Sequence, residues 1–354
     1  MSRFFSEKYK ELEPYTPGEQ PQDMRYIKLN TNESPFPPSP KAVAAAAEAA
    51  GRLQLYSDPE CRLLREKFCE VYGVDDDQVI FTNGSDEILN FAFMAFCDET
   101  HPAFFPNVSY GFYPVFARLN GVPFRELPLR GDFTVNVDDY CPLAGTIFLA
   151  NPNAPTGIAL IPAQIERILR ANPDNVVVVD EAYVDFGAES CLELVKQYDN
   201  LPVVQTFSKS RSMAGARLGF GVGNPSLIRD LNTLRYSTNP YDINSMTMAA
   251  GIGVLSDEEY TKKNCLSVME NRAFTSAGLR AMGFEVTDSL ANFVFMRHPE
   301  VGGEKIYREL KTHGVLVRHF DKPVIAEYNR VTVGTRDQMQ AFLDTLKKIL
   351  EELL

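Results

Sequence analysis

Residues 203–220 read VVQTFSKSRSMAGARLGF, and this stretch decides how the rest of the chain is interpreted. An apolar run comes first, Lys209 follows it, and Arg217 precedes a second apolar run. A lysine whose surroundings disfavour its charge becomes a nucleophile or forms a Schiff base with a carbonyl group. Ser208 and Arg217 carry donors that can bind phosphate oxygens. Most lysines just past a strand end are ordinary surface residues, so this stretch alone leaves both interpretations open.

The sequence around this stretch alternates short apolar runs with helix-like segments. The run Val176–Val179 has no polar alternation, and such strands are buried on both faces in parallel sheets covered by helices. The sequence therefore predicts an α/β fold with a mainly parallel sheet flanked by helices. We predict strands at 78–82, 146–149, 176–179, 203–207 and 218–222, and helices near 41–50, 60–72, 85–97, 162–171 and 189–198.

A second pattern begins near residue 255 and predicts a smaller α+β domain. A long charged helix over 256–282 precedes strands at 284–288, 292–297, 315–319 and 330–333 and helices near 303–313 and 336–353. Thr335 and Gln338 form a capping-box signal at the start of the last helix. We expect a small domain over 255–354, a large domain over 41–254, and an N-terminal arm over 1–40 that belongs to the small domain.

Composition and charge exclude several classes of protein. The 35 basic and 47 acidic residues give a net charge of −12, which disfavours nucleic acid but not a small anionic ligand. Six cysteines without a CxxC pair are typical of reduced thiols in the cytoplasm. The four histidines form no HExxH motif, so we expect no metal. We also expect no signal peptide, because charged and apolar residues alternate at the N-terminus. We expect no membrane association, because no apolar stretch reaches about 18 residues.

Three further motifs follow predicted strands. Residues 83–87 read NGSDE, and a glycine turn into a helix leaves free N–H groups where phosphate binds. Residues 151–157 read NPNAPTG, a rigid turn at a strand end, where such sheets bind ligands. Asp180 ends a buried run, and a carboxylate there needs a positive partner such as a protonated heterocyclic nitrogen. Alone, the first two motifs are better explained by a helix cap and a plain loop. An acid at the third position commonly pairs with an arginine or caps a helix.

Together and in this order, NGSDE, NPNAPTG, DEAY, SKS…AGARLGF and NRVTVGT resemble the motifs of the fold-type-I pyridoxal-phosphate aminotransferases. The resemblance is most specific to the histidinol-phosphate aminotransferase family, whose opening pattern is similar to LNTNESPFPPSP at 29–40. It covers essentially the whole chain and implies a homodimeric enzyme with pyridoxal 5′-phosphate as cofactor, bound by the large domain. The implied reaction, a step of histidine biosynthesis, converts L-histidinol phosphate and 2-oxoglutarate to imidazole acetol phosphate and L-glutamate.

The resemblance also implies roles for individual residues. Lys209 would form the Schiff base with the cofactor and later shuttle a proton, Asp180 would pair with the pyridinium nitrogen, and Tyr183 would hydrogen-bond the phenolic oxygen. The other implied cofactor contacts are the N–H groups around Gly84, Ser85 and Asp86, the side chains of Ser208 and Arg217, the stacking ring of Tyr110, and Tyr56 from the neighbouring subunit. The implied substrate contacts are Arg330, Arg318 and Tyr15.

One position departs from the family pattern. The family has an asparagine directly before Pro-Thr-Gly whose side chain contacts the phenolic oxygen, whereas this chain has Ala154. Either Asn153, one residue earlier, replaces it, or the contact is absent.

Other functions fit the sequence less well or stay open. The run GFGVG at 219–223 lacks the GxGxxG spacing of a nicotinamide dehydrogenase, and the GxSxG motif of serine hydrolases is absent. A cofactor-free binding protein of the same fold stays open. Within the superfamily, the alternatives are an aromatic or broad-specificity aminotransferase and an amino-acid-phosphate decarboxylase.

Overall fold

A seven-stranded sheet forms the larger part of the fold in the computed structural model, which describes residues 2–10 and 12–354. All pairings that exclude β8 are parallel, whereas β8 runs antiparallel to both of its neighbours. The predicted, mainly parallel sheet is therefore confirmed. In spatial order its strands are β2 (Val79–Thr82), β8 (Gly219–Val222), β7 (Val203–Thr206), β6 (Val177–Asp180), β5 (Thr146–Ala150), β3 (Ala103–Pro106) and β4 (Phe124–Leu127).

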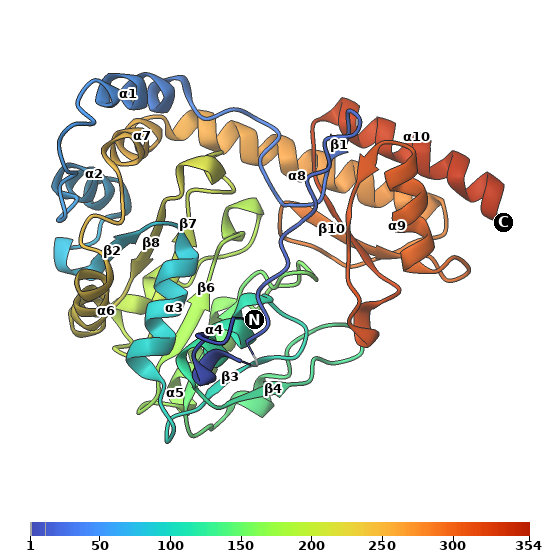
Figure 1. The fold of residues 1–354 in the computed structure, drawn as a ribbon. Coiled ribbons are helices and arrows are strands. Elements are labelled where there is room, and N and C mark those ends of the chain that lie inside the picture. The colour runs from blue at the N-terminus through green and yellow to red at the C-terminus, as the bar shows by residue number, and fades with distance from the viewer. Residues whose placement is uncertain (1, 11) are drawn as a thin grey trace.

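Helices cover both faces of this sheet, as the apolar strands require (Figure 1). On β6, Val177 and Val179 pack into one core cluster, whereas Val178 packs into the cluster on the opposite face. The first cluster includes α2 (Arg62–Tyr72), α5 (Pro162–Ala171) and α7 (Ser245–Leu255), with α1 (Pro40–Ala50) packed on α7. The second includes α3 (Ser85–Phe96), α4 (Phe112–Asn120) and α6 (Pro225–Thr238).

The carboxyl ends of the parallel strands meet at one edge of the sheet. Asp180 ends β6, Lys209 follows β7 by three residues, and the turn that holds Gly84 follows β2. Because β8 runs the opposite way, it begins at this edge, and Arg217 just before it lies there too. Residues far apart in the sequence are thus brought to one place by strand direction.

A second, antiparallel sheet lies beside the first, and α8 (Glu258–Ala281) runs between the two (Figure 1). The N-terminal strand β1 (Ile27–Lys28) pairs in parallel with β11 (Val315–Leu316), so the start of the chain packs with its end. The β1–β11 pair is a separate two-stranded sheet. The second, antiparallel sheet contains β12 (Arg318–His319), β13 (Asn329–Thr332), β10 (Phe293–Arg297) and β9 (Glu285–Val286), with α9 (Gly303–Thr312) and α10 (Arg336–Leu353) beside it.

Most predicted elements are confirmed, with three corrections. Near 189–198 the chain forms a short 3₁₀ helix, η5 (Leu192–Lys196), and no α-helix. The predicted strand 315–319 is divided between β11 and β12, which belong to different sheets. Strand 284–288 shortens to β9. The strands β1, β3 and β4 and the helices α4, α6 and α7 were not predicted. The other 3₁₀ helices are η1 (Glu7–Tyr9), η2 (Asp76–Gln78), η3 (Val137–Tyr140), η4 (Val184–Phe186), η6 (Ala214–Ala216) and η7 (Pro323–Ile325).

Two kinds of feature are absent from residues 2–10 and 12–354. No helix there combines the length and the low charge of a membrane span. No group of three or more His, Cys, Asp or Glu side chains lies close enough together to hold a metal ion.

The core of the large sheet yields a stability prediction. Phe148 on β5 is fully buried, and its ring stacks on Phe93 with centroids 4.0 Å apart. We predict that Phe148→Ala lowers the free energy of unfolding by about 3–5 kcal/mol, because it leaves a cavity between sheet and helix. Leu266→Ala, which truncates an exposed side chain of α8, is the control and should lower the free energy of unfolding far less. Urea denaturation followed by circular dichroism measures both, and equal losses would contradict the assigned core.

Candidate active site

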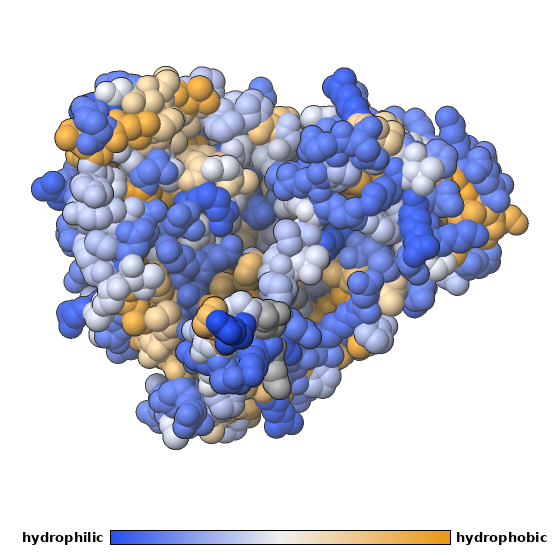
Figure 2. Space-filling model, viewed as in Figure 1, coloured by the Kyte–Doolittle hydropathy of each residue, from blue (hydrophilic) through white to orange (hydrophobic). Residues whose placement is uncertain are grey.

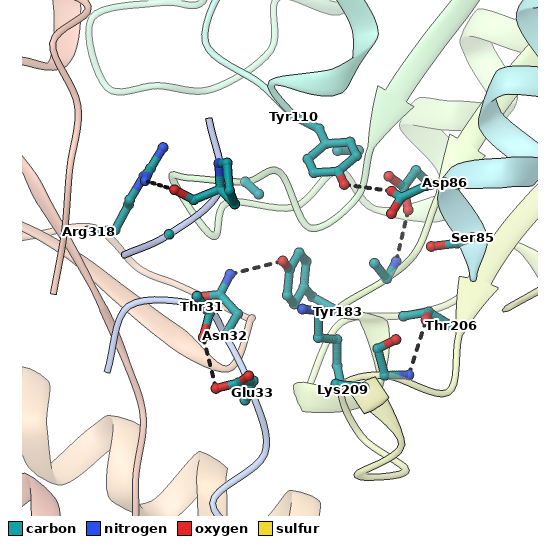
Figure 3. A pocket seen from close by; sticks show the side chains of 18 of the residues that line it. Thr31, Asn32, Glu33, Ser85, Asp86, Tyr110, Tyr183, Thr206, Lys209 and Arg318 are labelled. Carbon is teal, nitrogen blue, oxygen red and sulfur yellow. Dashed lines mark hydrogen bonds between the residues drawn. The ribbon is translucent and has the colours of Figure 1, made fainter. Parts of the chain in front are cut away.

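A cavity of about 390 Å³ lies at the carboxyl edge of the large sheet. Its walls come from the large sheet, the second sheet and the N-terminal arm, so it requires all three parts of the chain (Figure 3). Most residues predicted to form the site line it: Tyr15, Ser85, Asp86, Tyr110, Asp180, Tyr183, Ser208, Lys209, Arg217, Arg318 and Arg330.

Asp180 places a carboxylate at the floor of this cavity. It is only 6% exposed and accepts hydrogen bonds from the Tyr113 hydroxyl at 3.3 Å and the Ala182 N–H at 3.2 Å. Among the described residues, no basic side chain forms an ion pair with it. Burial therefore raises the pKa of Asp180 to about 7, although both hydrogen bonds oppose that shift. A cation entering the cavity would restore its charge.

Lys209 and Tyr183 lie side by side at the centre of the cavity (Figure 3). The Nζ atom of Lys209 is 5.7 Å from the centroid of the Tyr183 ring. The Tyr183 side chain is buried, and its hydroxyl oxygen accepts a hydrogen bond from Nδ2 of Asn32 at 2.9 Å. An amine and a phenol are thus held facing the same space.

The turn between β2 and α3 forms a cradle for an anion. Gly84 has φ = +83°, a backbone conformation that other residues adopt only with strain, so this turn favours glycine. Helix α3 begins at Ser85, which leaves the first N–H groups of its positive end without helical partners. Asp86 accepts from the Tyr110 hydroxyl at 2.6 Å and contacts Arg217 at 3.4 Å. This cradle joins a cation, N–H groups and an aromatic ring.

Two arginines line the opposite wall of the cavity, on the second sheet. Arg330 on β13 is half-buried, and its partial desolvation lowers its pKa; its Nη2 donates to the carbonyl of Asn30 at 3.2 Å. Its Nε atom is buried and finds no acceptor in the described part of the chain. Arg318 on β12 donates to the carbonyls of Thr16 and Pro17 in the N-terminal arm. Both guanidinium groups are available to a planar or tetrahedral anion.

Three predicted cofactor residues do not line the cavity: Gly84, in the turn beside it, Asn153 and Tyr56. Asn153 is buried behind the wall: its Nδ2 donates to the Val108 carbonyl, and its Oδ1 accepts from Ser109 Oγ at 2.8 Å. It is therefore not placed to replace the asparagine that is missing at Ala154. Tyr56 is 83% exposed and stacks on Tyr241, with centroids 4.5 Å apart. Within one chain it does not reach the cavity.

Sequence reasoning missed two side chains that complete the site. Asn32 belongs to the motif LNTNES, which signalled the family, yet its own role was not predicted. Its contact partner, Tyr183, lies 151 residues away, so no local pattern could indicate the pair. Tyr113 looks like an ordinary apolar residue of α4, although its hydroxyl contacts Asp180. Only the three-dimensional arrangement reveals either contact.

The burial of Asp180 yields a pH prediction. Its folded-state pKa of about 7 lies above the usual unfolded value near 3.9, so the folded ligand-free protein loses stability as pH rises between them. We predict that Asp180→Asn, which is neutral at every pH, stabilises the ligand-free protein by about 2–4 kcal/mol at pH 8. The gain should vanish near pH 4. Denaturation at both pH values measures it, and a pH-independent difference would contradict the assigned pKa.

Comparisons with known proteins agree with this geometry. A family model described as aminotransferase class I and II matches residues 25–346. A protein named histidinol-phosphate aminotransferase from Brachyspira hyodysenteriae is 47% identical over 99% of this chain and 100% of its own length. Histidinol-phosphate aminotransferase 1 from Bordetella parapertussis is 49% identical over 99% of each chain.

Solved structures show the same fold. The histidinol-phosphate aminotransferase of Sinorhizobium meliloti, in complex with pyridoxal-5′-phosphate, matches with a TM-score of 0.86 over 93% of this chain and 92% of that one. Their sequences are 22% identical, so this match supports the fold alone. The predicted fold type is thereby confirmed. The chain belongs to the class I and II aminotransferases and, among them, to the histidinol-phosphate aminotransferase family.

Proposed function

We propose that this enzyme transfers the amino group of L-histidinol phosphate to 2-oxoglutarate, producing imidazole acetol phosphate and L-glutamate in histidine biosynthesis. One observation carries the proposal. A lysine, a buried carboxylate and an anion cradle converge in a cavity whose opposite wall holds two arginines. Relatives that carry this activity in their names match the chain over nearly its whole length, which supports the same choice.

The residues of the cavity fit pyridoxal 5′-phosphate as cofactor. The cradle of Gly84, Ser85 and Arg217 suits a phosphate group, because the unpaired N–H groups at the start of α3 and the Arg217 guanidinium meet there. The carboxylate of Asp180 is buried without a cation, which suits a protonated ring nitrogen. When bound, this cofactor supplies an aldehyde that bonds to amines and a ring that accepts an electron pair.

Lys209 and Asp180 would perform the proton and charge work. The amine of Lys209 would hold the cofactor covalently until the amine of the substrate takes its place. The released Lys209 amine would then move a proton to and from the α-carbon of the substrate. Asp180 would accept a hydrogen bond from the ring nitrogen and keep that nitrogen protonated, with its own charge restored by the pairing. The Tyr113 hydroxyl would orient the Asp180 carboxylate for this contact.

Aromatic side chains would orient the ring between them. Tyr110, fixed by its hydrogen bond to Asp86, would stack on one face of the ring. Tyr183 would donate to the phenolic oxygen, while Asn32 holds the same hydroxyl from behind. Because Ala154 offers no amide, we propose that Tyr183 makes this contact without help from the side chain at position 154.

The two arginines suit an anionic substrate. Histidinol phosphate carries a phosphate where an amino acid carries its α-carboxylate, and a dianion benefits from two guanidinium groups. Arg330 would bind it with its free Nε, and Arg318 would bind from the side of Tyr15. A second cavity of about 190 Å³ shares Tyr15, Tyr110, Ala154 and both arginines with the first. It offers room for the part of the substrate that does not react.

Half-reactions test the substrate assignment. Enzyme loaded with cofactor is mixed with one amine at a time, and the change in visible absorbance reports amino transfer. We predict that histidinol phosphate converts the spectrum at lower concentration and faster than phenylalanine or threonine phosphate. If histidinol phosphate left the spectrum unchanged while another amine converted it, the substrate assignment would be wrong.

We further propose that the enzyme is a cytoplasmic homodimer divided into the domains 1–40 with 255–354 and 41–254. Figure 2 shows hydrophobic residues gathered at the surface over α1 and the loop after it. A second copy of the chain would cover this surface, and Tyr56 would reach the partner's cofactor phosphate. The exposed apolar side chains on this surface are Val43, Leu53, Leu55, Tyr56 and Leu63.

The free cysteines suit a reducing compartment, which supports the cytoplasm as the location of the enzyme.

The Tyr56 hydroxyl yields a prediction about cofactor retention. Tyr56→Phe should weaken cofactor binding by about tenfold or more, because a hydrogen bond to a charged phosphate is lost. Tyr241→Phe is a matched control: it removes a hydroxyl from the ring that stacks on Tyr56 and should leave affinity unchanged. Equilibrium dialysis measures the affinity, and sedimentation checks that both variants stay dimeric. Equal affinity in the wild type and Tyr56→Phe would contradict the role of Tyr56.

A further inference from the structure

An ion pair between Asp185 and Arg211 joins the two loops that carry Tyr183 and Lys209; its arginine is largely buried and its aspartate is partly exposed. Asp185 lies in η4, two residues after Tyr183, and Arg211 lies two residues after Lys209. The Nη1 atom of Arg211 is 3.0 Å from Oδ2 of Asp185. The Ser210 hydroxyl donates to the same carboxylate oxygen. A single carboxylate on the first loop therefore binds two consecutive residues of the second.

Aromatic rings fix the position of Arg211. Its guanidinium carbon lies 5.1 Å from the Phe207 ring, 5.8 Å from Phe220 and 5.9 Å from Tyr72, and Nη2 donates to the Tyr72 hydroxyl. The Arg211 side chain is only 10% exposed. Phe207 and Phe220 belong to the fully buried core of the large sheet. Asp185 is thus tied to a cation that cannot shift without disturbing this core.

The pair lies outside the cavity, next to residues inside it. Neither Asp185, Ser210 nor Arg211 lines the cavity, so none of them contacts a bound ligand there. Lys209 extends beside Tyr183 (Figure 3), and among the described residues no hydrogen bond holds its Nζ. Its position therefore depends on the backbone around 209–211, which Asp185 holds.

We propose that Asp185, Ser210 and Arg211 form a positioning clamp that sets the distance between the Lys209 amine and the Tyr183 hydroxyl. This inference rests on the proposed function of Lys209. An ion pair whose carboxylate is partly open to solvent adds little net stability, so geometry is the better explanation for its presence. The clamp residues position the reacting groups and take no direct part in the reaction.

The clamp predicts a spectroscopic change in the enzyme loaded with cofactor. The pH midpoint of the cofactor's visible absorbance reports the proton affinity of the nitrogen that Lys209 contributes. A hydrogen bond from Tyr183 to the phenolic oxygen lowers that affinity, so loosening the clamp should raise the midpoint. For Asp185→Asn we expect a rise of about half a pH unit or more. We also expect kcat to fall about tenfold while KM stays within about twofold, because Arg318 and Arg330 are untouched.

Three further variants separate positioning from stability. Leu231→Ala removes a buried side chain of α6, in a core cluster that includes neither loop, and should lower the melting temperature without moving the midpoint. Arg211→Lys keeps the charge opposite Asp185, so its pH midpoint should stay closer to the wild-type value than that of Asp185→Asn. Ser210→Ala removes one hydroxyl only and should give a smaller rise, so it serves if Asp185→Asn does not fold.

The outcomes distinguish this proposal from the proposed function. A wild-type midpoint that is shared by every folded clamp variant would overturn the clamp. A midpoint that moves equally in Leu231→Ala would overturn it as well, because the shift would then follow stability. If the wild type showed no visible titration, the assigned role of Lys209 would fail instead.

Discussion

The site depends on one electrostatic constraint: a carboxylate sits at the end of a buried strand without a basic partner. Helices on both faces of the sheet exclude water from β6, and this burial raises the pKa of Asp180 to about 7. Only a cation delivered into the cavity satisfies the arrangement. The phosphate cradle, the stacking tyrosine and the lysine are all arranged around the place where that cation would lie.

Two sheets divide the work of the cavity. The large sheet brings Asp180, Lys209 and Arg217 to one edge because its strands share a direction and β8 opposes it. The second sheet contributes Arg318 and Arg330, and the N-terminal arm crosses to meet Arg318. The cofactor chemistry we propose therefore belongs to the large sheet, while substrate selection belongs to the second. The clamp of Asp185, Ser210 and Arg211 would keep the chemical half rigid.

The sequence predicts the strands of the large sheet well where they are continuous and apolar, as at Val176–Val179. It fails at β3 and β4, whose short stretches AFFP and FREL carry a proline or charges and give no periodic signal. The direction of β8 was beyond prediction, because a strand buried on both faces reads the same either way. Contacts between distant segments pair Asn32 with Tyr183. Another such contact, from Ser109, holds Asn153 behind the wall of the cavity, so the sequence left its role open. The role of Tyr56 depends on a second chain.

The attachment point of the cofactor is the most direct test of the central claim. Enzyme loaded with pyridoxal 5′-phosphate is reduced with borohydride, digested, and the modified peptide is identified by mass spectrometry. We predict one modified residue, Lys209, and no label in Lys209→Ala. Label on another lysine, or none on the wild type, would contradict the assignment of this cavity as the active site.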